Sequence, residues 1–208
     1  MLTMNRLMTN LSRRARTDHW LAKEKGISLI DLYDVTTKLA FIHKCIFQWE
    51  IMPYIGSEYF PTYLGRGLHS LLRHNKNFLA IPAGTDRHWT YILVDLKSRT
   101  IEHWDGMGNN KSFEHPLTQF RLKQVYSYLG KYVGPDFRII NCVPHTHQNK
   151  HGYCGFHAVR FLEERMKGFS SGYIANNLNY DIEFTKFRYY RIRSTPIEKI
   201  RFLYNKKS

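Results

Sequence analysis

The feature that most constrains this chain is a cysteine-glycine pair at the head of a segment with helical periodicity. After Cys154 and Gly155, apolar residues recur at helical spacing as far as Gly168. This spacing predicts a helix buried on one side, with Gly168 as its stop. A helix N-terminus carries partial positive charge and N–H groups that stabilise a thiolate. The sequence therefore places Cys154 where a cysteine is readily activated as a nucleophile.

A second feature is a predicted β-hairpin rich in aromatic and β-branched residues. Residues 88–95 and 100–105 are predicted to be strands joined by a short turn, and residues 78–83 form a shorter apolar strand before them. A turn this short makes the two strands antiparallel, so the start of one faces the end of the other. We therefore expect His88 and Asp105 at the same end of the sheet.

Together these residues can carry thiol chemistry. A thiolate needs a base that holds its proton, and the base needs an orienting acceptor. His88 and Asp105 fit those two roles. Gln148 stands six residues before Cys154, and its side chain can donate an N–H to a developing oxyanion beside the Cys154 backbone N–H. The order histidine, carboxylate, glutamine, cysteine indicates a thiol-dependent hydrolase.

Simpler interpretations of each residue stay open. Cys154 could be a small buried hydrophobic residue, and Asp105 could only begin an Asp-Gly turn. Gln148 could be an ordinary loop amide. The chain has 11 histidines, and those that compete with His88 for the role of base are His103, His145, His147, His151 and His157.

The density of His and Cys around the nucleophile also raises a zinc site. Zinc sites usually present Cys/His pairs at clearer spacings than this one. We therefore expect no metal, and interpret the cluster as a polar rim around a cleft. Its members are His145, His147, His151, Cys154 and His157.

At these residues the chain resembles the cysteine protease clan of the adenovirus maturation protease and the SUMO-deconjugating (ubiquitin-like-protein-specific) proteases. The resemblance spans residues 78–167, and papain-like enzymes, which run Cys, His, Asn, fit badly. Many deconjugating enzymes have Asp where Tyr153 stands, and the adenovirus enzyme tends to have Glu at the position of Asp105. The matching residues are His88-Trp89, Asp105, Gln148 and Cys154-Gly155.

The resemblance implies a role for each residue. His88 would be the general base, Asp105 its orienting partner, Cys154 the nucleophile and Gln148 the oxyanion donor. It also implies two substrate-binding residues, of which Trp89 would line a narrow channel and Gly155 would allow close approach.

The resemblance further implies fold and function. The expected fold is α+β: a mixed central β-sheet flanked by helices, with the nucleophile at the N-terminus of a central helix, as in adenain-like proteases. The expected activity is a cysteine endopeptidase that cleaves after small residues, commonly Gly, and processes viral capsid or structural precursors during virion maturation. Removal of a ubiquitin-like modifier is the main alternative. An acetyltransferase related to bacterial effectors, or a catalytically silent nucleic-acid-binding structural component, would be further interpretations.

The remaining sequence predicts one domain over residues 1–208, with a basic N-terminal segment (1–25) and a basic, aromatic C-terminal segment (186–208). Three cysteines cannot all pair, which favours a reducing intracellular compartment. With the viral interpretation, this predicts a virus factory or nucleus and the virion, and no secretion. No apolar run reaches membrane length. We expect a monomer without cofactor, although an activating peptide or nucleic acid stays open.

The net charge is +14, and the C-terminal segment mixes basic with aromatic residues. That mixture is typical of non-specific nucleic-acid binding. The alternative is a solvated face whose apolar residues pack into the body. The arginines we expect to contact nucleic acid are Arg188, Arg191, Arg193 and Arg201.

The rest of the chain gives a coarse outline. Residues 28–49 and 117–133 have apolar spacing that predicts helices, and residues 137–143 predict a strand. Residues 49–64 are rich in Pro, Gly and Tyr, which predicts a loop that could wall a cleft. Residues 65–74 form a short link with some helical character.

Overall fold

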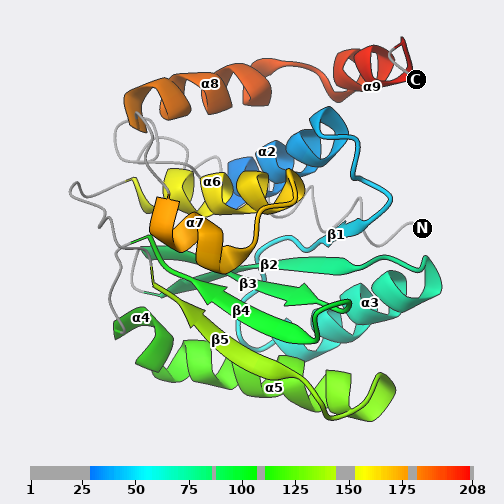
Figure 1. The fold of residues 1–208 in the computed structure, drawn as a ribbon, viewed down its shortest axis with the longest axis vertical. Helices are drawn as coiled ribbons and strands as arrows, with labels where there is room; N and C mark the ends of the chain where they lie inside the picture. Colours follow the sequence, from blue (N-terminus) through cyan, green and yellow to red (C-terminus); the bar gives the residue numbers. More distant parts are fainter. Residues whose placement is uncertain (1–28, 86–87, 107–110, 144–152, 178–181, 207–208) are drawn as a thin grey trace.

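The fold is built on one five-stranded mixed sheet with strand order β1-β2-β3-β4-β5 (Figure 1). The computed structural model describes residues 29–85, 88–106, 111–143, 153–177 and 182–206. Strands β2, β3 and β4 form an antiparallel meander, and β1 and β5 pair in parallel with its two edges. The strands are β1 Trp49–Ile51, β2 Phe78–Thr85, β3 His88–Asp95, β4 Thr100–Trp104 and β5 Arg138–Cys142.

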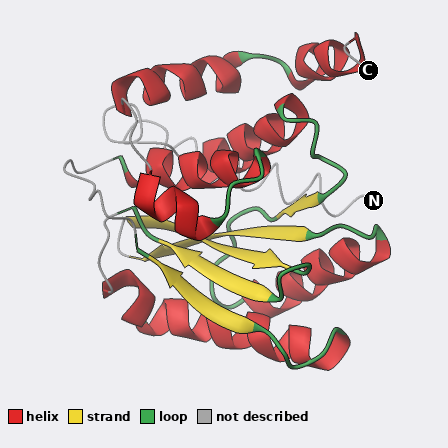
Figure 2. Ribbon diagram, viewed as in Figure 1, coloured by secondary structure: helices red, strands yellow, loops and turns green. Residues whose placement is uncertain are grey.

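Helices cover both faces of the sheet (Figures 1 and 2). One face carries α3 Phe60–Arg73, α4 Lys111–Glu114 and α5 Pro116–Tyr132. The other face carries α2 Leu29–Ile42, α6 Cys154–Met166 and α7 Ser171–Asn177. Helices α8 Ile182–Ser194 and α9 Ile197–Lys206 lie outside this second layer. Two apolar clusters fill the two interfaces. This arrangement confirms the predicted α+β class. No helix within the described ranges is long and apolar enough to cross a membrane.

The central hairpin has the predicted register. His88 pairs with Thr85 on one side, while Tyr91 pairs with Trp104 on the other. Asp105 follows Trp104 directly, so it lies at the end of the sheet where β3 begins. The turn between the strands contains Arg99 with φ 52°. His88 and Asp105 are therefore brought to one end of the sheet by strand pairing alone.

Helix α6 begins at Cys154, as predicted, and Gly168 with φ 95° lies just beyond its end. The expectation that α6 is buried on one side only is wrong. Most of its residues are buried, including Glu163. The cause is the packing of α6 between β3 below it and helices α2 and α8. It is therefore the central helix of its layer.

Several predicted boundaries differ in the structure. The helix expected over 28–49 ends at Ile42, because Lys44 adopts φ 56° and the Cys45 N–H bonds back to the Ala40 carbonyl, which closes the last turn. The loop expected over 49–64 contains β1 and the start of α3. The link at 65–74 belongs to the same helix α3. The basic C-terminal segment folds into most of α8 and all of α9, whereas residues 1–25 lie outside the described residues.

Candidate active site

Three predicted residues meet at one end of the sheet, each at the terminus of an element. His88 opens β3, Asp105 follows β4 and Cys154 opens α6. His88 Nε2 lies 2.5 Å from Asp105 Oδ1, and because a carboxylate only accepts, the ring donates. Cys154 lies close enough to the same imidazole to raise the pKa of His88. The structure therefore assembles the cysteine, histidine and aspartate that the sequence predicted.

The environment of His88 favours its protonated form. Burial lowers the pKa of His88, but hydrogen bonds and charge from Asp105 and Cys154 outweigh burial and raise the pKa to about 9. Two neighbouring histidines behave in the opposite way. Burial lowers the pKa of His103, and lowers that of His157 to about 4. At neutral pH, His88 is therefore the charged imidazole of these three, which suits the partner of a thiolate.

The other two cysteines are poor nucleophiles. Burial raises the pKa of Cys45 and of Cys142 to about 12 in each case. Neither begins a helix, whereas Cys154 stands in the first turn of α6, where N–H groups lack intrahelical acceptors. This contrast favours Cys154 as the nucleophile.

Asp105 is held by a partner that the sequence analysis missed. The Ser112 hydroxyl, on the short helix α4, donates to Asp105 Oδ2. Asp105 is 2% exposed and Ser112 is 6% exposed. No motif marks Ser112, because it comes from a different element seven residues downstream, and only the tertiary fold brings it to the carboxylate.

Trp89 follows His88 directly in β3, and its ring is packed from behind. A Cβ on Gly84 would lie 2.6 Å from the Trp89 ring, so the indole rests directly on the β2 backbone. The ring of Tyr54 meets Trp89 edge-on at 5.5 Å. Tyr54 lies in the segment predicted to wall a cleft, although its aromatic richness alone could not single it out.

A buried arginine supports this aromatic wall. Arg121, on α5, has no exposed surface and donates to the Gly84 carbonyl at 3.2 Å. Its guanidinium carbon also lies 5.1 Å from the centre of the Tyr54 ring. One side chain thus ties together the strand behind Trp89 and the loop that carries Tyr54.

The remaining predicted site residues are placed as follows. Gly155 is the buried second residue of α6. Gln148 lies outside the described residues, so its oxyanion role stays a prediction. Of the cluster weighed as a zinc site, Cys154 and His157 are described. The other members, His145, His147 and His151, lie outside the described residues.

The arginines expected to bind nucleic acid are in different environments. Arg188 forms a salt bridge with the buried Glu163, and Arg193 pairs with Asp31 at 2.7 Å. Arg191 and Arg201 have exposed side chains, and Arg201 lies 5.1 Å from the ring of Phe41. The prediction therefore rests mainly on Arg191 and Arg201.

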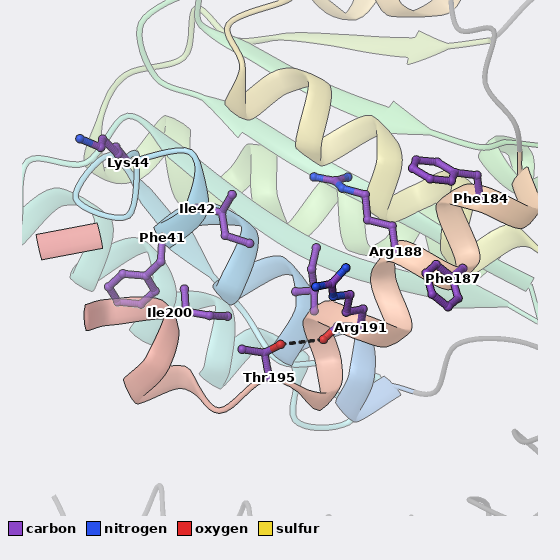
Figure 3. A pocket seen from close by; sticks show the side chains of 10 residues that line it. Phe41, Ile42, Lys44, Phe184, Phe187, Arg188, Arg191, Thr195 and Ile200 are labelled. Atoms are coloured by element: carbon purple, nitrogen blue, oxygen red, sulfur yellow. Dashed lines mark hydrogen bonds between the residues drawn. The ribbon is translucent and has the colours of Figure 1, made fainter. Parts of the chain in front are cut away.

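A pocket of about 540 Å³ lies on this side of the molecule, between the end of α2 and helices α8 and α9 (Figure 3). Arg188 and Arg191 line it together with apolar side chains such as Ile42 and Ile200. Its walls include none of His88, Asp105 and Cys154, so it is separate from the site at the start of α6.

Comparison with known families matches residues 44–199, which are 156 of the 208 residues, to the family described as "Ulp1 protease family, C-terminal catalytic domain". The chain belongs to the Ulp1 protease family. The match covers the sheet, α3 to α8 and the three candidate residues His88, Asp105 and Cys154, while α2 and most of α9 lie outside it. No curated protein sequence matches the chain.

Solved structures share the fold of this Ulp1-family chain. The yeast Ulp1 protease domain in complex with Smt3, the yeast ortholog of SUMO, is 14% identical with a TM-score of 0.58, covering 85% of this chain and 77% of that one. The ASFV pS273R protease is 15% identical with a TM-score of 0.55, covering 79% and 70%. ChlaDub1 from Chlamydia trachomatis is 14% identical with a TM-score of 0.51, covering 79% and 92%.

Family membership and geometry together establish the activity class. Among the similar structures is a SUMO protease Ulp1 whose catalytic cysteine is oxidised to a sulfinic acid, so the fold is one that carries a catalytic cysteine. In this chain Cys154 occupies a helix start near a histidine whose pKa is raised to about 9. The protein is a cysteine protease.

Proposed function

We propose that this cysteine protease is an endopeptidase that cleaves after small residues, with Gly preferred. The observation that carries the proposal is the aromatic wall formed by Trp89, the residue after His88, together with Tyr54. Trp89 is seated on Gly84 and contacts Tyr54, so it cannot retreat to admit a bulky side chain. A substrate residue next to the scissile bond then has to be small.

The chemistry follows from the three assembled residues. The Cys154 thiolate attacks the substrate carbonyl carbon, and the oxyanion that forms is stabilised by the Cys154 backbone N–H and, as proposed, by Gln148. The His88 imidazolium then gives its proton to the leaving amine. A thioester remains on Cys154, and neutral His88 takes a proton from water, which hydrolyses it. Asp105 stabilises the imidazolium in both halves of the cycle.

For the substrates, we propose capsid or other structural precursors of a virus, cut during virion maturation in a reducing intracellular compartment. Support comes from the net charge of +14, which would concentrate the enzyme on packaged nucleic acid without sequence preference. Removal of a ubiquitin-like modifier is the second candidate. The same wall favours it, because a modifier joined through a small C-terminal residue meets the same requirement.

Two experiments test this function. Peptides that differ only in Gly, Ala, Leu or Phe before the scissile bond should be cleaved fastest with Gly, and Cys154→Ala should cleave none. Equal rates with Gly and Phe would contradict the narrow channel. Incubation with viral structural precursors and with ubiquitin-like adducts then separates the two substrate classes. Exclusive cleavage of the adducts would replace the maturation proposal by deconjugation.

A further inference from the structure

We infer that Ser112 is a positioning residue of the active centre, whose hydroxyl holds Asp105 in the orientation that aims Oδ1 at His88. The inference rests on the proposed roles of His88 and Asp105 in proteolysis. It extends the three-residue arrangement to four, in the order Cys154, His88, Asp105, Ser112.

The two carboxylate oxygens of Asp105 face different partners. Oδ1 accepts from His88 Nε2 at 2.5 Å, and Oδ2 accepts from the Ser112 hydroxyl. Rotation about the last side-chain bond of an aspartate is only weakly restricted. A donor on each oxygen fixes that rotation. The Ser112 hydrogen bond therefore helps to aim Oδ1 at the imidazole.

Ser112 is itself held in place from the α5 side. The next residue, Phe113, packs its ring 5.5 Å from that of His103 and joins the apolar cluster under the sheet. Its carbonyl accepts from Gln119 Nε2, on α5, at 2.6 Å. Helix α4 is thus anchored to α5 and to the sheet, and from this position the Ser112 hydroxyl reaches Asp105 just after the end of β4.

A neutral donor suits this place better than a cation. Asp105 is almost fully buried, and a buried carboxylate is stable only when hydrogen bonds satisfy it. A hydroxyl stabilises the anion without adding charge. A lysine or arginine here would neutralise Asp105 and remove the charge that raises the pKa of His88. Serine therefore orients Asp105 and leaves its negative charge available to the imidazolium.

Titration of the His88 ring tests the inference without any substrate. NMR of histidine-labelled full-length protein, with His88 assigned by H88Q, should give a midpoint near 9 for the wild type. In Ser112→Ala the midpoint should fall by about half a unit or more, because the carboxylate turns away from the ring. Ser112→Thr keeps the hydroxyl and should restore it. Ser70→Ala is the matched control, since Ser70 donates to the carboxylate of Glu50 away from the site.

Kinetics on a Gly-containing peptide give a second readout. Ser112→Ala should lower kcat about ten-fold with KM within about two-fold, since the imidazolium is needed in the chemical steps rather than in binding. The alkaline limb of its pH profile should move with the NMR midpoint. If the wild type cleaves no peptide, the proposed function fails, while the titration still decides the role of Ser112.

Two results would overturn the inference. One is a Ser112→Ala protein that titrates like the wild type. The other is a Ser112→Thr protein that titrates no better than Ser112→Ala, which would reduce Ser112 to packing. Should Ser112→Ala fail to fold, Ser112→Cys, which fills the space with a weaker donor, takes its place and should show the same downward shift.

Discussion

At the scale of single residues, the pKa values of the three buried histidines near the active site differ because of their hydrogen-bonding and charged neighbours and not because of their exposure. His88, His103 and His157 are all substantially buried, yet only His88 has a raised pKa. The difference is the carboxylate of Asp105, which accepts a hydrogen bond from the His88 ring, and the sulfur of Cys154, which also raises the pKa of His88. Removing either partner should therefore return His88 to the behaviour of its neighbours.

Asp105→Asn should lower kcat/KM at least about a hundred-fold, because the amide cannot stabilise an imidazolium as a carboxylate does. The alkaline limb of the pH–rate profile should also fall from about 9 toward the ordinary histidine range. Steady-state kinetics across pH measure both effects. Asp136→Asn, on an exposed aspartate, is the control. An unchanged alkaline limb in Asp105→Asn would mean that another group governs it.

The raised pKa of His88 should also appear in stability. A group whose folded-state pKa is raised contributes stability that is fully present below its unfolded pKa, about 6.5, and that is lost as pH rises through about 9. The free energy of unfolding of wild type minus that of His88→Gln should therefore fall by about 3 kcal/mol between pH 6 and pH 10. Urea denaturation at both pH values measures it. A flat difference would show that Asp105 does not stabilise the imidazolium.

At the scale of elements, the sequence predicted those that local pattern determines. The central hairpin and the position of α6 are predicted correctly, because alternation, turn length and helical spacing lie in consecutive residues, whereas the one-sided burial expected for α6 is not found. The end of α2 was wrong, because its stop depends on the left-handed conformation of Lys44, a residue with no turn signature. Strand β1 was missed because three residues carry too little pattern. Ser112 was missed because only tertiary packing brings it to Asp105.

Gly84 on β2 should be intolerant of a side chain. In Gly84→Ala the new methyl would overlap the Trp89 ring and push it toward the substrate path. We expect kcat/KM on Gly-containing peptides to fall about ten-fold or more, as for other small misplacements of a binding wall. Gly56→Ala is the control, since nothing lies within 4 Å of its added Cβ. Equal activity of the two variants would show that Trp89 has room to move.

Helix α8 is fastened to α6 through one buried carboxylate. Burial alone would raise the pKa of Glu163, yet hydrogen bonds from His43, Arg188 and Tyr189 hold it well below its ordinary value. Arg188 makes a bidentate pair with it, and Tyr189 donates at 2.8 Å. The arginine that the sequence suggested for nucleic acid therefore joins two helices.

Arg188→Met should lower the free energy of unfolding by about 3 kcal/mol, because it leaves the Glu163 charge buried with fewer partners. Arg191→Met, one turn further along α8 and exposed, should change it by less than about 0.5 kcal/mol. Chemical denaturation of the two variants gives the comparison. Similar losses in both would mean that the salt bridge contributes little to holding α8.

At the scale of the whole molecule, only some of the basic side chains behind the net charge of +14 are free of the ion pairs inside the fold and available to bind a partner. Some cations, such as Arg165 with Asp95 and Arg193 with Asp31, are engaged inside the fold. Counting basic residues in the sequence therefore overstates the surface available to a phosphate backbone, and could not show which arginines remain outside.

If the protein binds nucleic acid as proposed, affinity should fall steeply with salt and show little sequence preference. Substituting both Arg191 and Arg201 with Gln should reduce the slope of log affinity against log salt by about 0.9 for each phosphate that the variant no longer neutralises. Fluorescence anisotropy with a labelled duplex measures this. Lys123→Gln, an exposed change on α5, is the single-charge comparison. No binding by the wild type at low salt would assign the charge to another partner.

The fastening of α6 by α8 also orders events during synthesis. The ribosome makes the nucleophile at residue 154 before it makes Arg188 and Tyr189, which hold Glu163 on the same helix from 25 and 26 positions downstream. Until those residues emerge, the catalytic helix carries a buried charge short of two partners. We therefore expect the active centre to be complete only after α8 has been made, so that a polypeptide stopping short of α8 should be a poor protease.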